Sequence, residues 1–160
     1  MNANDVLYYG NQTVVGAVDG LPEEAWFRPN VCGVWSVKDI IAHLASFEHL
    51  LVETLRSQMG QAETPALDRF LKGGQAFNDY EVPRRQEMTV SAVWEEYTET
   101  HREAAELLQQ FPVEKQRING LLSWYGPGYD LEDFIAYSFY GHKREHCAQI
   151  MVFRDLLATE

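Results

Sequence analysis

Histidines are the residues of this 160-residue chain whose spacing most clearly suggests chemistry, and there are five of them: His43, His49, His101, His142 and His146. His142 and His146 stand four residues apart, so in a helix both imidazoles project from one face. That face is otherwise apolar. His43 also lies on an apolar helix face, between Ile40 and Phe47. The pattern therefore predicts three imidazoles that point inward from two helices.

A buried imidazole needs a hydrogen-bond partner or a metal, because leaving it unsatisfied in an apolar core costs free energy. One divalent transition metal would satisfy all three rings, each through a neutral nitrogen. Three histidines with one open position are typical of a catalytic zinc site, and nickel or iron also suit imidazole. Taken singly, the His142–His146 pair and His43 each fit a hydrogen-bonded core histidine better than a ligand. Their combination favours a metal site at His43, His142 and His146.

Three polar residues stand where they could orient these rings. Asp39 precedes His43 by one turn, although capping of the helix explains it equally well. Ser138 stands one turn before His142, and Gln149 follows His146 by three residues. Both could instead satisfy the helix backbone or the polarity of the core.

The other histidines and the two cysteines have simpler interpretations. His101 could be a fourth ligand, a proton carrier or an ordinary core histidine, and we favour the last. His49 lies off the apolar face, so we expect it to be solvated. Cys147 points about 100° away from its neighbour His146 and is interpreted as a packing residue. Cys32 lies in a loop, where most thiols are inert, and two thiols in a reducing compartment are expected to be free.

Helical periodicity extends over most of the chain and predicts an all-α fold. Four amphipathic helices are expected at about residues 4–19, 36–59, 89–111 and 130–158, with Pro, Gly, Ser and Asp residues marking their ends. The stretch 61–87 interrupts the pattern, apart from a possible short helix near 66–71. Such a long crossover would let the second and third helices run parallel, so we predict one four-helix bundle domain over residues 1–160.

The charge balance excludes several functions. The chain has 13 basic and 24 acidic side chains and a net charge of −11, which argues against nucleic acid and anionic membrane surfaces as partners. Its apolar stretches fall short of the roughly 20 residues of a membrane span. The first residues lack the basic and apolar regions of a secretory signal, so a cytoplasmic protein is expected.

Several segments together resemble one known family. They are WSVKDIIAHL at 35–44 followed by Glu48, the lead-in LPEEAW at 21–26, and GHKREHCAQI at 141–150. These resemble the DinB/YfiT-like superfamily, and the stretch from Asn78 through Arg84 to His101 is similar to its ClbS/DfsB branch. The resemblance implies a four-helix bundle with up-down-down-up topology that is commonly dimeric. It also implies a three-histidine metal site, carried here by His43, His142 and His146.

The resemblance also suggests classes of activity. Characterised relatives include thiol transferases that use a low-molecular-weight thiol, a thiol-dependent isomerase and a protein that inactivates an electrophilic genotoxin. The leading hypothesis is a metal-dependent enzyme, a hydrolase or a thiol S-transferase, acting on a small electrophile. His101, Glu48 or a loop tyrosine could then move protons. The alternatives are a ClbS/DfsB-like protein that sequesters a small molecule or toxin without metal catalysis, and a purely structural bundle.

Overall fold

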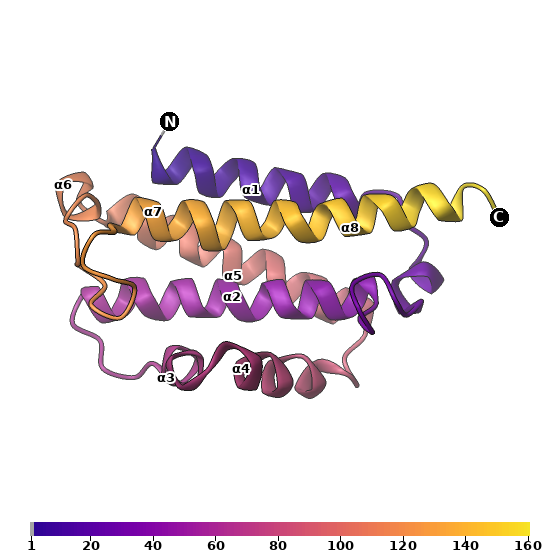
Figure 1. Cartoon of the computed structure of the whole chain (residues 1–160), viewed down its shortest axis with the longest axis horizontal. Helices are drawn as coiled ribbons and strands as arrows, with labels where there is room; N and C mark the ends of the chain where they lie inside the picture. The colour runs from indigo at the N-terminus through magenta and orange to yellow at the C-terminus, as the bar shows by residue number, and fades with distance from the viewer. Residues whose placement is uncertain (1) are drawn as a thin grey trace. The chain divides into compact units, whose positions relative to one another are not determined.

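The computed structural model describes residues 2–160, and within them it is all-helical, apart from an isolated bridge between Cys32 and Trp35. This confirms that the fold is all-α, as predicted. The chain divides into two compact units. The first is formed by the two ends of the chain, up to Val37 and from Pro112 onward, and the second by Lys38–Phe111. Figure 1 labels the helices of both units.

The first unit contains α1, α6, α7, α8 and two further helical turns. Their bounds are Ala3–Val18 for α1, Glu23–Phe27 for η1, Val113–Gln116 for α6, Leu131–Ile135 for α7, Ala136–Gly141 for η3 and His142–Leu157 for α8. The last three form one uninterrupted helical run. Asp130 caps this run, and its carboxylate accepts a hydrogen bond from the Asp133 main-chain N–H. The predicted fourth helix is thus confirmed, with a capping box at its start.

Helix α1 and the run α7–η3–α8 pack side by side and parallel (Figure 1). Near the start of both, the Ala3 main-chain N–H donates to the Glu132 carboxylate, 129 residues away. Near their ends, the Arg154 guanidinium donates to the Ala17 carbonyl, 137 residues away. The difference in residue number between contacting positions is thus nearly the same at both ends of the helices. Two helices with this property run in the same direction.

Gly10 is a point of close approach between α1 and η3. A Cβ atom at this position would lie 2.6 Å from the Phe139 carbonyl oxygen, whereas one at Gly16 would meet nothing within 4 Å. We expect Gly10→Ala to lower the free energy of unfolding by about 1–3 kcal/mol, because two backbones would have to separate. Gly16→Ala should be neutral or stabilising by up to about 1 kcal/mol. Urea unfolding of both variants checks this, and equal stabilities would contradict it.

The second unit contains the remaining helices. Their bounds are Val37–Gln58 for α2, Pro65–Lys72 for α3, Gly74–Glu81 for α4, Pro83–Arg85 for η2 and Val90–Gln110 for α5. Thr89 caps α5 by accepting a hydrogen bond from the Ala92 main-chain N–H. Helices α2 and α5 begin and end close to the predicted positions, and α3 confirms the possible short helix at 66–71.

Helix α4 departs from the expectation of an irregular stretch at 61–87. Its sequence begins with glycine and has weak helical propensity, so local preferences do not indicate it. Tertiary packing explains its formation: Phe77 is 1% exposed, and its ring meets those of Phe47 and Phe70 edge to face at 5.7 and 5.6 Å. Burial of Phe77 on this aromatic cluster outweighs the poor local propensity.

Within the second unit, α2 and α5 run parallel. Near the start of α2, Lys38 Nζ donates to the Gln86 carbonyl, which lies 48 residues further along the chain. Near its end, Arg56 pairs with Glu103, 47 residues further along. Because the difference in residue number is almost the same at both ends, the two helices are parallel, as the long crossover predicts.

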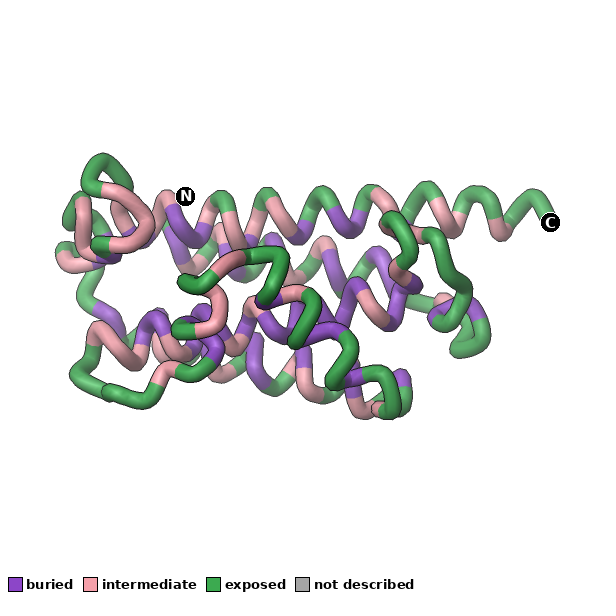
Figure 2. Tube along the Cα trace, turned by 60° about the horizontal axis from the view of Figure 1, so that its bottom comes forward, coloured by how far each residue is buried: buried purple, intermediate pink, exposed green. Residues whose placement is uncertain are grey.

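Burial is densest along α2, where most positions are shielded from solvent (Figure 2). Among residues 2–160, none of the helices combines the length and apolar composition that crossing a lipid bilayer requires.

Candidate metal centre

His142 and His146 face each other across one turn at the start of α8. Their Nε2 atoms lie 3.0 Å apart, and the rings meet edge to face with centroids separated by 4.7 Å. His146 is buried and His142 is half-buried. The predicted shared face is therefore confirmed, and the two Nε2 atoms lie next to each other.

A π-helical segment directly precedes this pair. The His142 main-chain N–H bonds to the Tyr137 carbonyl, five residues back, and η3 spans Ala136–Gly141. Such a turn holds one residue more than an α-helical turn, and segments of this kind are frequent at functional sites. The extra residue changes the phase between α7 and α8 and so helps to set the direction of His142. Sequence periodicity missed it, because a single wide turn leaves the surrounding apolar pattern almost unchanged.

Gln149 orients His146, as its position three residues later suggested. His146 Nδ1 lies 2.9 Å from Gln149 Oε1, so the ring donates its Nδ1 proton to the amide oxygen. In that tautomer Nε2 is unprotonated and its lone pair points toward His142. The Trp35 ring, 6.3 Å from the His146 ring, lies on the other segment of the same unit.

Both imidazoles are held in the neutral form. Burial lowers the pKa of His142 to about 4, helped by the proximity of His146 and opposed by the Ser138 carbonyl. Burial also lowers the pKa of His146, although its hydrogen bond to Gln149 works in the opposite direction. Neutral imidazole is the ligand form, so neither ring has to lose a proton before it can bind a metal at neutral pH.

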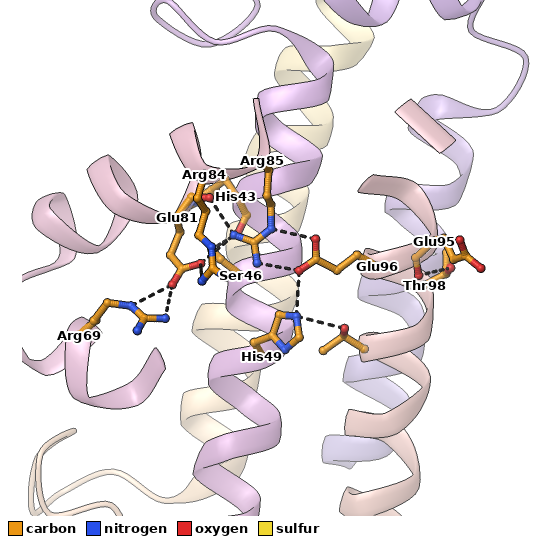
Figure 3. A network of polar contacts seen from close by, with 11 residues as sticks. His43, Ser46, His49, Arg69, Glu81, Arg84, Arg85, Glu95, Glu96 and Thr98 are labelled. Atoms are coloured by element: carbon orange, nitrogen blue, oxygen red, sulfur yellow. Dashed lines mark hydrogen bonds and ion pairs between the residues drawn. The ribbon is translucent and has the colours of Figure 1, made fainter. Parts of the chain in front are cut away.

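His43 comes from the middle of α2 and is 2% exposed. Its ring packs edge to face on Phe47 at 4.9 Å, and the Ser46 hydroxyl donates to the His43 carbonyl (Figure 3). Asp39, one turn earlier, accepts a 3.5 Å hydrogen bond from the Gln86 amide. The orienting role suggested for Asp39 stays a prediction.

The three predicted histidines form one cluster. His43, His142 and His146 each offer a ring nitrogen, and these nitrogens all lie within 4.8 Å of one another. The set contains three imidazoles and no carboxylate or thiolate, a composition that suits zinc, nickel or iron. The cluster is therefore compatible with a divalent metal site.

The other two histidines are paired with carboxylates of their own unit. His101 Nδ1 lies 3.3 Å from Glu48 Oε2, and the ring stacks on Tyr97 with centroids 6.2 Å apart. His101 thus has the contacts of a core histidine. His49 Nε2 lies 3.0 Å from Glu96 Oε1, although the side chain is 41% exposed. The expectation of a merely solvated His49 was incomplete, because the parallel packing of α5 brings Glu96 to it.

The two thiols are free. Cys147 is 2% exposed, and burial raises its pKa to about 11, so it is protonated at neutral pH and poorly nucleophilic. Its interpretation as a packing residue agrees with this environment. Cys32 is half-buried, beside the bridge to Trp35.

A network of ion pairs surrounds α2 one to two turns beyond His43 (Figure 3). Arg85 is its centre: the guanidinium donates to both carboxylate oxygens of Glu96, at 2.9 and 2.7 Å, and to Glu81 at 2.7 Å. Arg69 makes two further hydrogen bonds to Glu81. The network ties α3, α4 and η2 to α5. Sequence reasoning missed it, because residues in five separate segments supply its members.

Burial and hydrogen bonding act against each other on the carboxylates of this network. Burial alone would raise the pKa of Glu96, but hydrogen bonds and charge from His49 and Arg85 lower it to about 2. Burial likewise opposes the net lowering of the Glu81 pKa by Arg85 and Arg69. Both carboxylates are therefore charged at neutral pH and held by arginine.

Comparison with known protein families places the chain in a family. The sequence model of the DinB superfamily matches residues 7–150, which include all three clustered histidines. No curated protein and no solved structure matches the chain significantly. Because the match spans nearly the whole chain, this protein belongs to the DinB superfamily.

Proposed function

We propose that this protein is a metal-dependent enzyme that acts on a small electrophilic substrate, with His43, His142 and His146 as the metal ligands. The observation that carries the proposal is the grouping of three ring nitrogens within 4.8 Å. Membership of the DinB superfamily supports it. Because one fold can serve many reactions, the choice between a hydrolase and a thiol S-transferase depends on the substrate and not on the fold.

The spacing of the ring nitrogens fits a transition metal. Zinc–nitrogen bonds measure about 2.0–2.1 Å, so two ligands of a tetrahedral ion stand about 3.3 Å apart. The Nε2 atoms of His142 and His146 are 3.0 Å apart, so only a small movement separates them from that geometry. Gln149 already holds the Nδ1 proton of His146, which leaves the Nε2 lone pair available.

A divalent metal held by three neutral histidines would supply Lewis acidity and lower the pKa of a bound thiol or water molecule. The chain contributes orientation and burial. Gln149 fixes the tautomer of His146, and the low exposure of His43 and His146 keeps competing water from these rings. A low-molecular-weight thiol is the proposed second reactant for S-transfer, and water is the second reactant for hydrolysis.

We further propose the architecture of the family, a single four-helix bundle with up-down-down-up topology that forms a homodimer. Two parallel helix pairs support this topology: α1 with α8 in one unit, and α2 with α5 in the other. Up-down-down-up order requires these two parallel pairs, since its first and fourth helices share one direction and its second and third share the other.

Elemental mass spectrometry of the untagged protein tests the metal proposal. We expect about one zinc, nickel or iron per chain, and loss of the metal when His43, His142 and His146 are all replaced by alanine. His49→Ala is the matched control, since it removes an imidazole outside the cluster and should leave the metal content unchanged. A parent protein that stays metal-free after each ion is added would overturn the proposal.

Activity assays then separate the two reaction classes. The metal-loaded parent is mixed with an activated aryl halide and a low-molecular-weight thiol, or with an activated ester alone. Thiol-dependent turnover that disappears in the triple variant supports S-transfer, and thiol-independent turnover supports hydrolysis. Binding of electrophiles that is equal in the parent and the triple variant, without turnover, would contradict an enzyme and favour sequestration.

A further inference from the structure

The π-helical segment η3 takes the usual main-chain donor away from one carbonyl, that of Ser138. In an α-helix, this carbonyl would accept a hydrogen bond from the main-chain N–H of the residue four positions later, His142. Here that N–H bonds to the Tyr137 carbonyl instead. The Ser138 carbonyl can therefore receive a different donor, and carbonyl groups inside a protein nearly always have one.

The His142 ring is placed to be that donor. Its Nδ1 atom is shielded from solvent, and the Ser138 carbonyl acts on the ring as a hydrogen-bond acceptor. Its other nitrogen, Nε2, faces Nε2 of His146 at 3.0 Å. Because a carbonyl can only accept, a ring held in this way carries its proton on Nδ1.

The two metal-ligand candidates of α8 are then held in the same tautomer by different kinds of group. Gln149 accepts the Nδ1 proton of His146 through a side chain. Ser138 accepts that of His142 through the main chain. A substitution at position 149 removes the first acceptor, whereas the second persists through any side-chain change that preserves the π-helical turn.

Packing from two sides holds this wide turn in place. Helix α1 comes so close that a Cβ atom at Gly10 would lie 2.6 Å from the Phe139 carbonyl oxygen. On another side, the Tyr125 hydroxyl is hydrogen-bonded to the Ser138 side chain, and the Tyr125 ring packs on Phe134 with centroids 5.0 Å apart. Because π-helical turns are rare, we interpret these contacts as what maintains the turn.

We propose that the Ser138 main-chain carbonyl, freed by the π-helical turn, is a positioning group that holds the His142 ring with its proton on Nδ1 and leaves Nε2 to bind the ion. The inference deepens the proposed function and rests on it for the role of the ion. Metal-binding histidines usually donate their second N–H to a carboxylate or carbonyl, and loss of such a partner lowers metal affinity roughly 10–100-fold.

The tautomer of His142 in the metal-free protein is the first test. Long-range proton–nitrogen correlation NMR distinguishes a protonated from an unprotonated ring nitrogen, and His142→Gln identifies the signals. At neutral pH, after a chelator has removed any metal, we expect the proton on Nδ1. His146→Ala should leave this tautomer unchanged, because the acceptor lies in the backbone and not on the neighbouring ring. A proton on Nε2 of His142 in either protein would overturn the proposal.

Exchange of one amide for an ester tests the carbonyl itself. The α-hydroxy analogue of phenylalanine at position 139 makes the Ser138 carbonyl part of an ester, which is a weaker acceptor than an amide. The same exchange at Phe153, about two turns beyond His146, is the matched control, since it also removes one main-chain N–H from a helix.

Zinc affinity and the His142 tautomer are then compared between the two esters and the parent. In competition with a chromophoric chelator, we expect the zinc dissociation constant to rise about tenfold for the ester at 139 and to stay unchanged for the ester at 153. The ester at 139 should also shift the His142 proton toward Nε2. Equal affinities of the parent and the ester at 139, or equal losses in both esters, would contradict the role of Ser138.

These measurements separate the proposal from the proposed function. A parent protein that binds no added metal would contradict the metal centre, whereas the tautomer of His142 would still show whether Ser138 holds the ring. A protein that binds metal but carries the His142 proton on Nε2 when metal-free would keep the metal centre and overturn the role of Ser138. The first test needs no change in the turn, so it decides the question even if an ester variant does not fold.

Discussion

Replacing Arg85 by methionine is expected to lower the free energy of unfolding by about 3–5 kcal/mol, because two carboxylates would lose their shared partner inside the protein. The Arg85 side chain is 5% exposed, and those of Glu81 and Glu96 are 2% and 22% exposed. Methionine fills a similar volume but offers no positive charge and no donor. The loss is therefore mainly the cost of taking the shared counter-charge from two shielded carboxylates, of which Glu81 keeps Arg69 and Glu96 keeps His49.

The geometry of Arg85 makes lysine a poor substitute. Its guanidinium donates through Nε and one terminal nitrogen to the two oxygens of Glu96, and through the other terminal nitrogen to Glu81. A single ammonium group cannot reproduce that fork. We therefore expect Arg85→Lys to recover only part of the lost stability.

Chemical denaturation at pH 7 measures these changes, and Arg84→Met is the matched control. Arg84 precedes Arg85 in the chain and contacts the same carboxylate at 3.6 Å, but its side chain is 49% exposed. An ion pair so open to solvent contributes at most about 1 kcal/mol. Equal losses in the two variants would show that burial of the network is not what makes Arg85 important.

Acidification below about pH 4.5 is expected to remove roughly 3 kcal/mol of stability through Glu96. The folded protein lowers the pKa of this carboxyl from its ordinary value of 4.5 to about 2. Between these two values the unfolded chain binds more protons than the folded one. The contribution of Glu96 is therefore complete above about pH 4.5 and is lost as the pH falls toward 2.

Glu96→Gln isolates this contribution. The variant should be less stable than the parent at pH 7, and the difference should shrink as the pH approaches 2, where the parent carboxyl is also protonated. Glu95→Gln is the control, since Glu95 is an exposed neighbour in the same helix turn. Urea unfolding curves at pH 7, 4 and 2.5 give the comparison. A stability difference between Glu96→Gln and the parent that is the same at every pH would contradict the assignment.

The local rules of helices account for what could be predicted of the fold. Apolar residues at spacings of three and four, with Thr89 and Asp130 at helix starts, were enough to place the long helices within a few residues. Helix α4 was not predicted, because its stability comes from the packing of Phe77 on an aromatic cluster and not from local helical propensity. The π-helical turn before His142 was also not predicted, because a single wide turn barely changes the spacing of apolar residues in the sequence.

The candidate site divides in the same way. The sequence by itself determined which imidazoles share a helix face, because spacing along one helix fixes the side on which each residue lies. This holds for His142 and His146, and for Gln149 beside them. The tertiary structure alone decided that His43 joins them, that Glu96 reaches His49, and that Arg85 holds two carboxylates. Those contacts join residues that lie on different helices, and helical periodicity specifies the side of a helix that is buried but not the partner that covers it.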